Sequence, residues 1–332
     1  MSWRILPEIL SDSRVFIQTH DFPDPDAIAS AYGLQYLLRQ CGIEATLCYR
    51  GSLERAFLTH IIETYHIELL EQAQIQAMRP EDKIVLVDGQ KFNANMVDLP
   101  GDEVACIDHH PTFTPCEYRY KDVRQVGACS SIIAEYFLSD NVPMTVELAT
   151  LLLFGLRVDT DNMTRGVTDL DLNVFPFLYR QADQNMLAHL AAKNLEFSDL
   201  KAFGAAIGNI RVYNHVGFVS IPFDCHDSLI AQVANFILSL AEVDIAIIWS
   251  WRSGGLKFSV RNVLKSIHSG NMLATVLADV GSGGGHASMA GGFIPTGNLQ
   301  LLGQSHSVQE TALVDKFLHY IHQHTLLASG SK

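Results

Sequence analysis

The chain contains 332 residues, of which 48% are hydrophobic and 18% are charged, so it is not a disordered or low-complexity protein. Its length is typical of two domains, each long enough to bury a hydrophobic core. The 23 basic and 36 acidic residues give a formal charge of −13, which argues against a protein that coats long nucleic acid through many phosphate contacts. A short phosphate ligand in a local basic pocket is compatible with this charge.

The start of the chain and the cysteine pattern are typical of a cytoplasmic protein. The start of the chain has no apolar run of the signal-peptide kind, and apolar stretches such as Leu148–Leu156 are too short to span a bilayer. The six cysteines are scattered and include no Cys-x-x-Cys pair. We therefore expect a cytoplasmic protein with reduced, mostly buried thiols, and neither a disulfide framework nor a thiolate zinc site.

The first half of the chain alternates short apolar strands with amphipathic helices. The pattern predicts strands at 14–19, 45–49, 83–87 and 104–107, and helices at 27–39, 53–65, 129–138, 146–157 and 170–182. The last two strands are apolar throughout, which indicates burial on both faces and favours parallel pairing. We expect an α/β fold with a mostly parallel sheet that carries helices on both faces.

A second pattern begins beyond about residue 200. It predicts strands at 217–222, 244–251 and 256–260, and helices at 200–212, 229–240, 272–278 and 308–325. We interpret it as a second, smaller α/β domain. The expected domains are therefore 1–190 and 200–332, joined by a linker at 185–200 where polar residues interrupt the apolar content.

Acidic and histidine side chains follow most of the expected strands of the first half. The set comprises His20, Asp24, Asp26, Asp88, Asp108, His109 and His110, with Asp159 and Asp161 at the end of the helix from 146. Ligands of open α/β sheets bind beyond the carboxyl ends of the strands, and carboxylates with imidazoles suit hard or borderline divalent cations. Each residue alone could be a turn, cap or core residue. Together they favour two metal ions that share one bridging carboxylate.

These residues resemble the motifs of the DHH phosphoesterase family. The first motif is His-Asp-Phe-Pro-Asp-Pro-Asp at 20–26, the second is Val-Leu-Val-Asp at 85–88, the third is Asp-His-His at 108–110, and the fourth is Gly-Leu-Arg-Val-Asp-Thr at 155–160. Gly-Gly-Gly-His at 283–286 is similar to the signature of the C-terminal domain associated with the family. Two positions depart from the pattern, because Ala29 replaces the usual Gly and Asn262 replaces a frequent Ser.

The resemblance implies a site for two divalent cations, manganese first, with magnesium or cobalt as alternatives. It implies that His20, Asp24 and Asp88 hold one ion, and that the second is held by Asp26, Asp88, His109 and Asp159. Asp108 and His110 would be catalytic: Asp108 would orient a metal-bound histidine, and His110 would contact the scissile phosphate and protonate the leaving oxygen. Asp161 has no assigned role. The family places its active site in the cleft between the two domains.

A basic segment distinguishes the second half of the chain. Between 245 and 278 there is no acidic residue, whereas Arg252, Lys257, Arg261 and Lys265 are basic. We expect the substrate to contact Arg261, the backbone of Gly283, Gly284 and Gly285, and His286, since glycines let N–H groups approach phosphate closely. On the charges alone, a solvated strand face is an equally good interpretation.

The small number of basic residues favours a short oligonucleotide or a mononucleotide as substrate. Among family members, the chain resembles the compact two-domain type, an oligoribonuclease that acts on nanoRNA or an adenosine 3′,5′-bisphosphate phosphatase. Alternatives are a soluble phosphodiesterase for cyclic or linear dinucleotides, a polyphosphatase, and a non-catalytic nucleotide-binding regulatory module. Pyrophosphatase relatives have a different second domain. We expect no clamp for long nucleic acid and no membrane partner, and a homodimer is left open.

Overall fold

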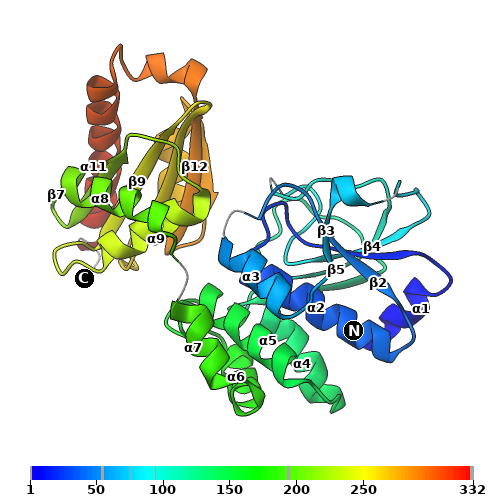
Figure 1. The fold of residues 1–332 in the computed structure, drawn as a ribbon. Helices are drawn as coiled ribbons and strands as arrows, with labels where there is room; N and C mark the ends of the chain where they lie inside the picture. Colours follow the sequence, from blue (N-terminus) through cyan, green and yellow to red (C-terminus); the bar gives the residue numbers. More distant parts are fainter. Residues whose placement is uncertain (1, 54–55, 76, 94, 193–194, 330–332) are drawn as a thin grey trace. The chain divides into compact units, whose positions relative to one another are not determined.

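The computed structural model describes residues 2–53, 56–75, 77–93, 95–192 and 195–329, and the chain divides into two compact units, 1–194 and 195–332. Each unit contains its own sheet and helices (Figure 1). The segment expected as a linker is helical over much of its length, since α7 spans Gln184–Ala192 and a short 3-10 helix spans Phe197–Asp199. Residues 193–194 lie outside the described residues.

The first unit is built on a six-stranded sheet in which every strand pair is parallel. Its strands are β1 (Val15–Gln18), β2 (Ala45–Tyr49), β3 (Leu69–Glu71), β4 (Lys83–Val87), β5 (Asp102–Asp108) and β6 (Tyr120–Val123). Its helices are α1 (Leu6–Leu10), α2 (Pro25–Gln40), α3 (Ala56–Thr64), α4 (Cys129–Asp140), α5 (Val146–Asp159), α6 (Asp169–Gln181) and α7. The expected fold class is therefore confirmed.

The strand order of this sheet, β3-β2-β1-β4-β5-β6, determines where a ligand can bind. The chain first builds outward from β1 to β3 and then returns to place β4 on the other side of β1. Connections on the two sides of β1 therefore leave the sheet in opposite directions, which opens a crevice at the carboxyl ends of β1 and β4. Loops that follow these two strands are thus brought together by topology alone.

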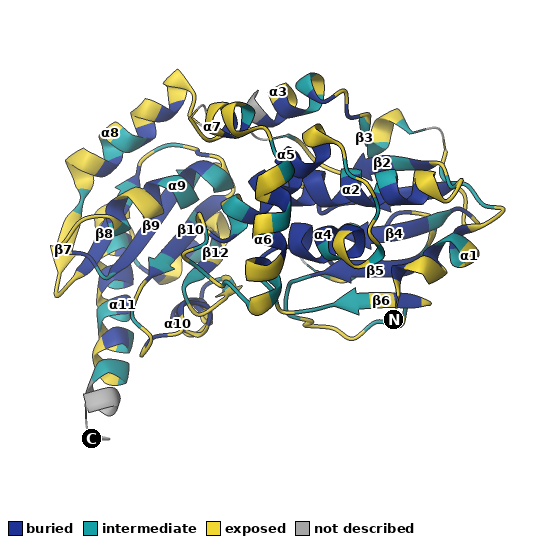
Figure 2. Ribbon diagram, turned by 90° about the horizontal axis from the view of Figure 1, so that it is seen from below, coloured by how far each residue is buried: buried dark blue, intermediate teal, exposed yellow. Residues whose placement is uncertain are grey.

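The two faces of the first sheet are covered differently. One face packs against the helices, with Leu34 of α2, Ile133 of α4 and Leu152 of α5 fully buried in the same hydrophobic cluster. The other face is covered mainly by non-helical chain that includes Met96 and Leu99. Strands β1, β2, β4 and β5 are largely buried (Figure 2), as the apolar sequences of β4 and β5 predict. The edge strands β3 and β6 are mostly half-buried. Non-helical chain thus covers one face of the sheet, where helices were expected.

The second unit contains a mixed sheet of order β11-β12-β10-β9-β8-β7, in which β8 and β9 pair in parallel and the other pairs are antiparallel. Its strands are β7 (Arg211–Tyr213), β8 (Val216–Ile221), β9 (Ile245–Arg252), β10 (Gly255–Asn262), β11 (Ser282–Gly285) and β12 (Met289–Pro295). Its helices are α8 (Leu200–Asn209), α9 (Asp227–Leu238), α10 (Ser269–Leu277) and α11 (His306–Ser329).

Several elements differ from the sequence predictions for local reasons. The helix expected at 200–212 ends at Asn209, because the next residues form β7 and turn back into β8 through Asn214 and His215, whose φ angles are 47° and 65°. Such a two-residue turn with positive φ is typical of a hairpin. The helix expected at 53–65 is described only from Ala56, since 54–55 lie outside the described residues. Strands β11 and β12 were not predicted, because their glycines have low strand propensity.

Two global expectations concern membranes and cysteines. Among the described residues, no helix has the length and hydropathy that crossing a membrane would require. All six cysteines are free, and four of them are buried, namely Cys48, Cys106, Cys129 and Cys225.

A close approach of α5 to α2 and α4 makes one glycine critical for the first unit. A Cβ at Gly155 would lie 2.6 Å from Ser130 Oγ and 2.9 Å from the Asp26 Cα. We expect Gly155→Ala to lower the free energy of unfolding by about 1–3 kcal/mol, because the overpacked helices must shift. The measurement is denaturant unfolding at equilibrium.

The matched control is Gly204→Ala in α8, where a Cβ would have no heavy atom within 4 Å. Gly204 is exposed, and its substitution should raise the free energy of unfolding by up to about 1 kcal/mol, because alanine has the higher helix propensity. Equal effects of the two substitutions would contradict the packing argument.

Candidate functional site

Histidine and aspartate side chains gather at the carboxyl edge of the first sheet. Three groups have ligand atoms that lie within 4.8 Å of one another: His20 with Asp24 and Asp88; Asp26 with His109 and Asp159; and Asp88 with His109 and His110. Asp88 belongs to two of the groups. The structure therefore brings together every residue that the sequence analysis assigned to the metal site.

The topology explains this convergence. His20 follows β1, Asp88 follows β4, and Asp108 with His109 closes β5, so three adjacent strands deliver their next residues to one edge. Asp24 caps the N-terminus of α2, with its Oδ1 accepting from the N–H groups of Asp26 and Ala27 at 2.9 and 3.0 Å. The carboxyl end of α5 supplies Asp159.

Asp88 is the most constrained of these residues. Its side chain is 1% exposed, and its φ of 58° lies in the left-handed region that non-glycine residues rarely adopt. Such a backbone conformation costs on the order of 1–3 kcal/mol and persists only where surrounding contacts enforce it. Here the Asp88 N–H donates to Ile107 O at 3.0 Å, which ties the turn after β4 to β5.

Asp26 is held by the N-terminus of α4. Its carboxylate accepts from the N–H groups of Cys129 at 2.7 Å and Ser130 at 2.9 Å. The N-cap residue of that helix, Ala128, has no side-chain acceptor, so Asp26 performs the capping from another part of the chain. The positive end of the helix dipole also favours the charged carboxylate.

His109 is oriented as a ligand would be. Its Nδ1 donates to Val126 O at 3.1 Å, so its Nε2 faces Asp88 Oδ1 and Asp159 Oδ2, both at 3.3 Å. Neither Asp88 Oδ1 nor His109 Nε2 has a hydrogen-bond partner, although both atoms are buried. Buried polar atoms that converge without bonding one another suit a cation between them, and a metal-binding histidine commonly donates its other N–H to a carbonyl.

The electrostatics of the site favour positive charge. Burial, together with the charges of Asp159 and Asp88, raises the pKa of Asp24 to about 6. Burial lowers the pKa of His109, but Asp159 and Asp88 outweigh it and raise this pKa well above its usual range. No carboxylate of the clusters is paired with a lysine or arginine among the described residues. The residues present therefore fit divalent cations, which would supply the missing charge.

Asp108 has a different partner from the one that the family resemblance implies. The resemblance predicts that Asp108 orients a metal-bound histidine, but Asp108 Oδ1 lies 2.8 Å from His110 Nδ1, while His109 is held by a backbone carbonyl. Burial lowers the pKa of His110, whereas the hydrogen bond to Asp108 and the charge of Asp88 raise it to about 9. These contacts favour the protonated form of His110.

Asp161 lies outside the clusters. It is exposed, and it begins a run of three left-handed residues with Asn162 and Met163 that ends α5. Its backbone carbonyl accepts from Thr164 Oγ1 at 2.6 Å. Arg165 then returns to donate to Asp159 O at 3.2 Å, so this turn fixes the backbone of a cluster residue.

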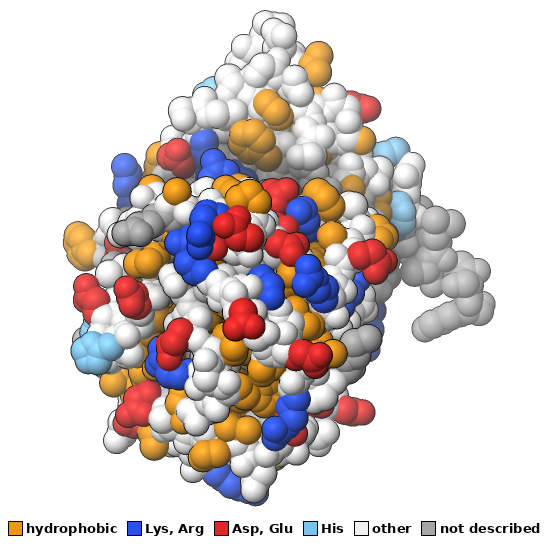
Figure 3. Space-filling view, turned by 90° about the vertical axis from the view of Figure 1, so that its right-hand side faces the viewer, with side chains coloured by type: hydrophobic (Ala, Val, Ile, Leu, Met, Phe, Trp, Pro, Cys, Tyr) orange, Lys and Arg blue, Asp and Glu red, His pale blue; other side chains and the backbone are white. Residues whose placement is uncertain are grey.

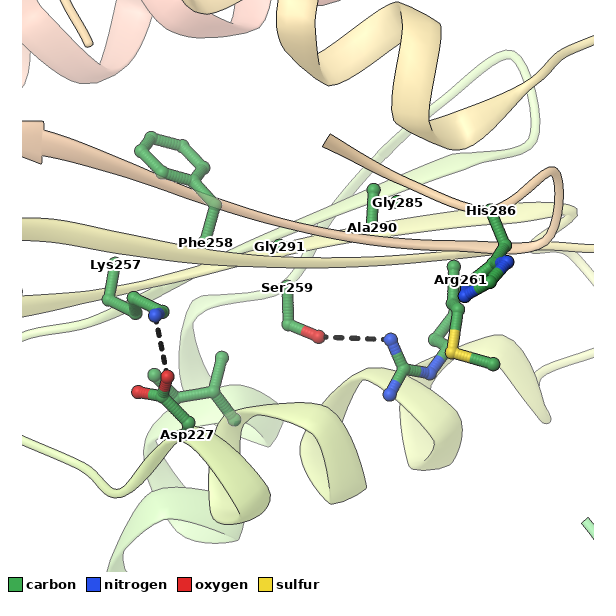
Figure 4. Close-up of a pocket in the computed structure, with 11 residues that line it drawn as sticks. Asp227, Lys257, Phe258, Ser259, Arg261, Gly285, His286, Ala290 and Gly291 are labelled. Carbon is green, nitrogen blue, oxygen red and sulfur yellow. Dashed lines mark hydrogen bonds and ion pairs between the residues drawn. The ribbon is translucent and has the colours of Figure 1, made fainter. Parts of the chain in front are cut away.

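A pocket of about 300 Å³ in the second unit contains part of the expected substrate site. Arg261 and His286 line it, with Gly285 at the end of β11, and Lys257, Ser259 and Asp227 complete its polar wall (Figure 4). Arg261 Nη1 donates to Ser259 Oγ at 3.2 Å, and Lys257 forms an ion pair with Asp227. Basic groups thus face the pocket from β10.

The glycine run, whose backbone the sequence analysis expected to contact the substrate, lies in a strand. Residues 282–285 form the edge strand β11, and of the three glycines only Gly285 lines the pocket. At Gly283 a Cβ would lie 2.7 Å from Leu273 Cγ, so glycine there permits packing against α10. Gly284 has open space around its Cβ position. These two residues are therefore not placed at the pocket.

Sequence reasoning missed Lys257 and Ser259 as pocket residues, as well as Gln90 at the metal site. The signal for the first two was present, because 257, 259 and 261 alternate along β10 and therefore share one face. Gln90 had no comparable signal, since it lies in a turn and reaches Asp108 only in the folded protein.

Each of the two units matches a known domain family. Residues 14–156 match the DHH family, N-terminal domain, and residues 214–308 match the DHHA1 domain. An uncharacterized protein of Methanocaldococcus jannaschii is 25% identical over 312 residues, which cover 92% of this chain and 64% of that protein. A Streptococcus suis protein described as a probable manganese-dependent inorganic pyrophosphatase is 30% identical over 221 residues, 60% of this chain and 70% of that protein.

A solved structure with the same fold is an exopolyphosphatase-related protein from Bacteroides fragilis. It has a TM-score of 0.70 at 20% identity and covers 92% of this chain and 93% of that chain. The chain spans less than two thirds of the length of the first curated relatives that it matches, and about half of several streptococcal ones.

Metal binding should release protons. Asp24 and His109 have raised pKa values and hold protons that an ion must displace, so the apparent affinity should increase as pH rises through about 6. Calorimetric titration with Mn²⁺ in buffers of different ionisation enthalpy measures the protons released. Asp24→Asn should reduce that number, and pH-independent affinity without proton release would contradict the assignment.

The cluster membership predicts how individual substitutions affect metal content. Asp88→Asn should abolish binding of both ions, because Asp88 groups with His20 and Asp24 and its Oδ1 lies 3.3 Å from His109 of the other group, whereas Asp24→Asn should mainly affect the ion bound with His20. Metal content per chain, measured by elemental analysis after circular dichroism has confirmed folding, tests this. If the Asp88 variant retained two ions, the bridging assignment would be wrong.

Proposed function

Because the chain belongs to the DHH family, we propose that it is a metal-dependent phosphoesterase that hydrolyses short oligonucleotides or nucleotide phosphates such as adenosine 3′,5′-bisphosphate. The observation that carries the proposal is the convergence of two ligand groups at the edge of the first sheet, His20 with Asp24 and Asp88, and Asp26 with His109 and Asp159. Asp88 Oδ1 lies 3.3 Å from His109 Nε2 and so joins the two groups. Manganese is the preferred metal, in keeping with the names of the streptococcal relatives, and magnesium or cobalt is the alternative.

The chemistry follows from the charge of the site. When bound, divalent ions lower the pKa of coordinated water and neutralise charge on phosphoryl oxygens. His110 acts on the leaving group: as a water molecule gives up a proton to solvent and its oxygen bonds to phosphorus, the ester P–O bond breaks and His110 Nε2 gives its proton to the departing oxygen. The hydrogen bond between His110 Nδ1 and Asp108 Oδ1 favours the protonated imidazole, which carries an Nε2 proton to donate.

The pocket of the second unit supports a nucleotide as substrate. Its volume of about 300 Å³ is at the lower end of the range for small-molecule sites. Arg261 provides positive charge for phosphate, whereas the charge of Lys257 is balanced by Asp227 in the same pocket. On the face drawn in Figure 3, basic side chains are interspersed with acidic and apolar ones rather than gathered in a continuous stripe. The formal charge of −13 favours a short substrate over a long strand.

A second candidate is a polyphosphate or pyrophosphate hydrolase, which the names of the relatives favour. Such a substrate has no base, so it would use the metal centre without the apolar part of the second-unit pocket. A non-catalytic nucleotide-binding module is less well supported, because no residue of the expected metal site is replaced.

A substrate panel with Mn²⁺ tests the proposal. We expect hydrolysis of dinucleotides to tetranucleotides, of adenosine 3′,5′-bisphosphate, or of both, with lower kcat/KM for pyrophosphate, polyphosphate, cyclic dinucleotides and long RNA. Preference for pyrophosphate or polyphosphate would favour the second candidate. No hydrolysis by fully metal-loaded protein would reject the proposed activity.

Arg261→Ala should separate substrate recognition from chemistry. For nucleotide substrates, loss of one phosphate or base contact should lower kcat/KM on the order of 5- to 150-fold. A chromogenic aryl phosphate has no nucleoside to occupy the pocket, so its hydrolysis should change little.

The matched control is Arg211→Ala, which removes an exposed arginine from β7 in the same unit. It should leave both substrates unaffected. An equal decrease for the two substrates in Arg261→Ala, at unchanged metal content, would show that Arg261 acts on folding or on the metal centre.

A further inference from the structure

A chain of hydrogen bonds reaches His110 from outside the metal-ligand groups. Thr112 Oγ1 donates to Gln90 Oε1 at 2.8 Å, and Gln90 Nε2 donates to Asp108 Oδ2 at 2.7 Å. The other oxygen of Asp108 lies 2.8 Å from His110 Nδ1. Gln90 Nε2 also donates to His110 O at 3.0 Å. The glutamine amide therefore contacts the side chain of Asp108 and the backbone of His110.

The amide of Gln90 can occupy this place in one orientation only. Its two N–H groups each face an acceptor, the Asp108 carboxylate and the His110 carbonyl, and its oxygen faces the hydroxyl donor of Thr112. Gln90 is 3% exposed and Asp108 is fully buried, so water does not compete for the bond between Gln90 and Asp108. Both N–H donors of the amide and its oxygen therefore have partners.

We propose that Gln90 is a positioning residue for catalysis: it fixes the Asp108 carboxylate, which in turn holds the His110 proton on Nδ1 and directs Nε2 toward the substrate. The inference rests on the proposed function insofar as His110 acts on a phosphoester. An ionised carboxylate only accepts hydrogen bonds, so the Asp108–His110 contact requires the proton on Nδ1. Without Gln90, Asp108 Oδ2 would be buried without a donor and could rotate away from His110.

The position of Gln90 couples this network to the metal centre. Asp88, in its left-handed conformation, and Gln90 belong to the same turn after β4, so one backbone geometry aims a carboxylate at the metal site and an amide at Asp108. At Gly89, between them, a Cβ would lie 2.4 Å from Met96 Cε. Packing beneath the turn therefore restrains both side chains together.

No close substitute for glutamine preserves these contacts. Glutamate would keep the acceptor for Thr112 but would place a second carboxylate against Asp108, with no donor for the His110 carbonyl. Methionine has a similar length and volume and removes both donors without introducing charge. Gln90→Met is therefore the substitution that isolates the hydrogen bonds.

The kinetic test compares two substrates that differ only in the leaving group, in the Mn²⁺-loaded enzyme. A dinucleotide needs its alkoxide leaving group protonated, whereas the 4-nitrophenyl ester of the same nucleotide does not. Gln90→Met should lower kcat for the dinucleotide by about 10- to 100-fold, with little change for the nitrophenyl ester, in KM or in metal content. Thr112→Val, at the exposed end of the network, should produce a smaller decrease of the same kind.

The control is Gln18→Met. Gln18 is also a buried glutamine of the first unit, and its amide donates to Val97 O at 2.7 Å and contacts Met96 Sδ at 3.4 Å. It forms no hydrogen bond with Gln90, Asp108 or His110 among those of the described residues. The substitution should lower stability without changing the ratio of the two kcat values. In addition, Gln90→Met combined with His110→Ala should be no slower than His110→Ala alone, because Gln90 acts through His110.

A spectroscopic readout tests the inference independently of turnover. In the Mg²⁺-loaded protein, the Nδ1–H proton resonance of His110, assigned by its loss in His110→Ala, should be present in the parent and in Gln18→Met, and broadened or absent in Gln90→Met. An unchanged resonance, equal kcat losses for both esters, or additive losses in the double variant would each overturn the inference. If the parent hydrolyses no phosphoester, the proposed function fails, but the resonance still tests the role of Gln90.

Discussion

The mutual repulsion of the carboxylates around Asp88 is the constraint on which the first unit depends. Asp24, Asp26 and Asp159 converge with Asp88, and no lysine or arginine among the described residues pairs with any of these side chains. Without cations, the site must retain protons, as the raised pKa values of Asp24 and His109 indicate. Divalent ions would balance the negative charge that the fold concentrates at this site.

Several residues of this site also hold the fold together. Asp24 caps α2, and Asp26 caps α4 from a distance of more than a hundred residues along the chain. The close passage of α5 at Gly155, next to Asp26, places Asp159 at the same edge. Metal site and helix packing therefore share their contacts, so changes to the ligands should be assessed for folding as well as for metal binding.

The two units divide the chemical tasks in the proposed function. The first holds the metal-ligand groups and the network from Thr112 to His110, which concern bond cleavage whatever the substrate. The second offers the pocket beside β10, where Arg261 and Lys257 can contact phosphate. In relatives with the first unit in common, a different second unit could therefore select a different phosphate ester or anhydride while the cleavage chemistry stays the same.

The sequence by itself determined most strands of the parallel sheet, most helices and the histidine and aspartate residues that cluster at its edge, because apolar periodicity and short motifs are local properties of the chain. Strands β4 and β2 were predicted to the residue, and His20, Asp88 and His109 could be proposed from their positions after strands. Tertiary structure alone decided which side chains pair across the sequence. The partner of Asp108 is His110, Gly283 packs against α10, and Gln90 joins the site through a turn. Hydrogen-bond partners depend on distances between segments remote in sequence, and no local pattern encodes those distances.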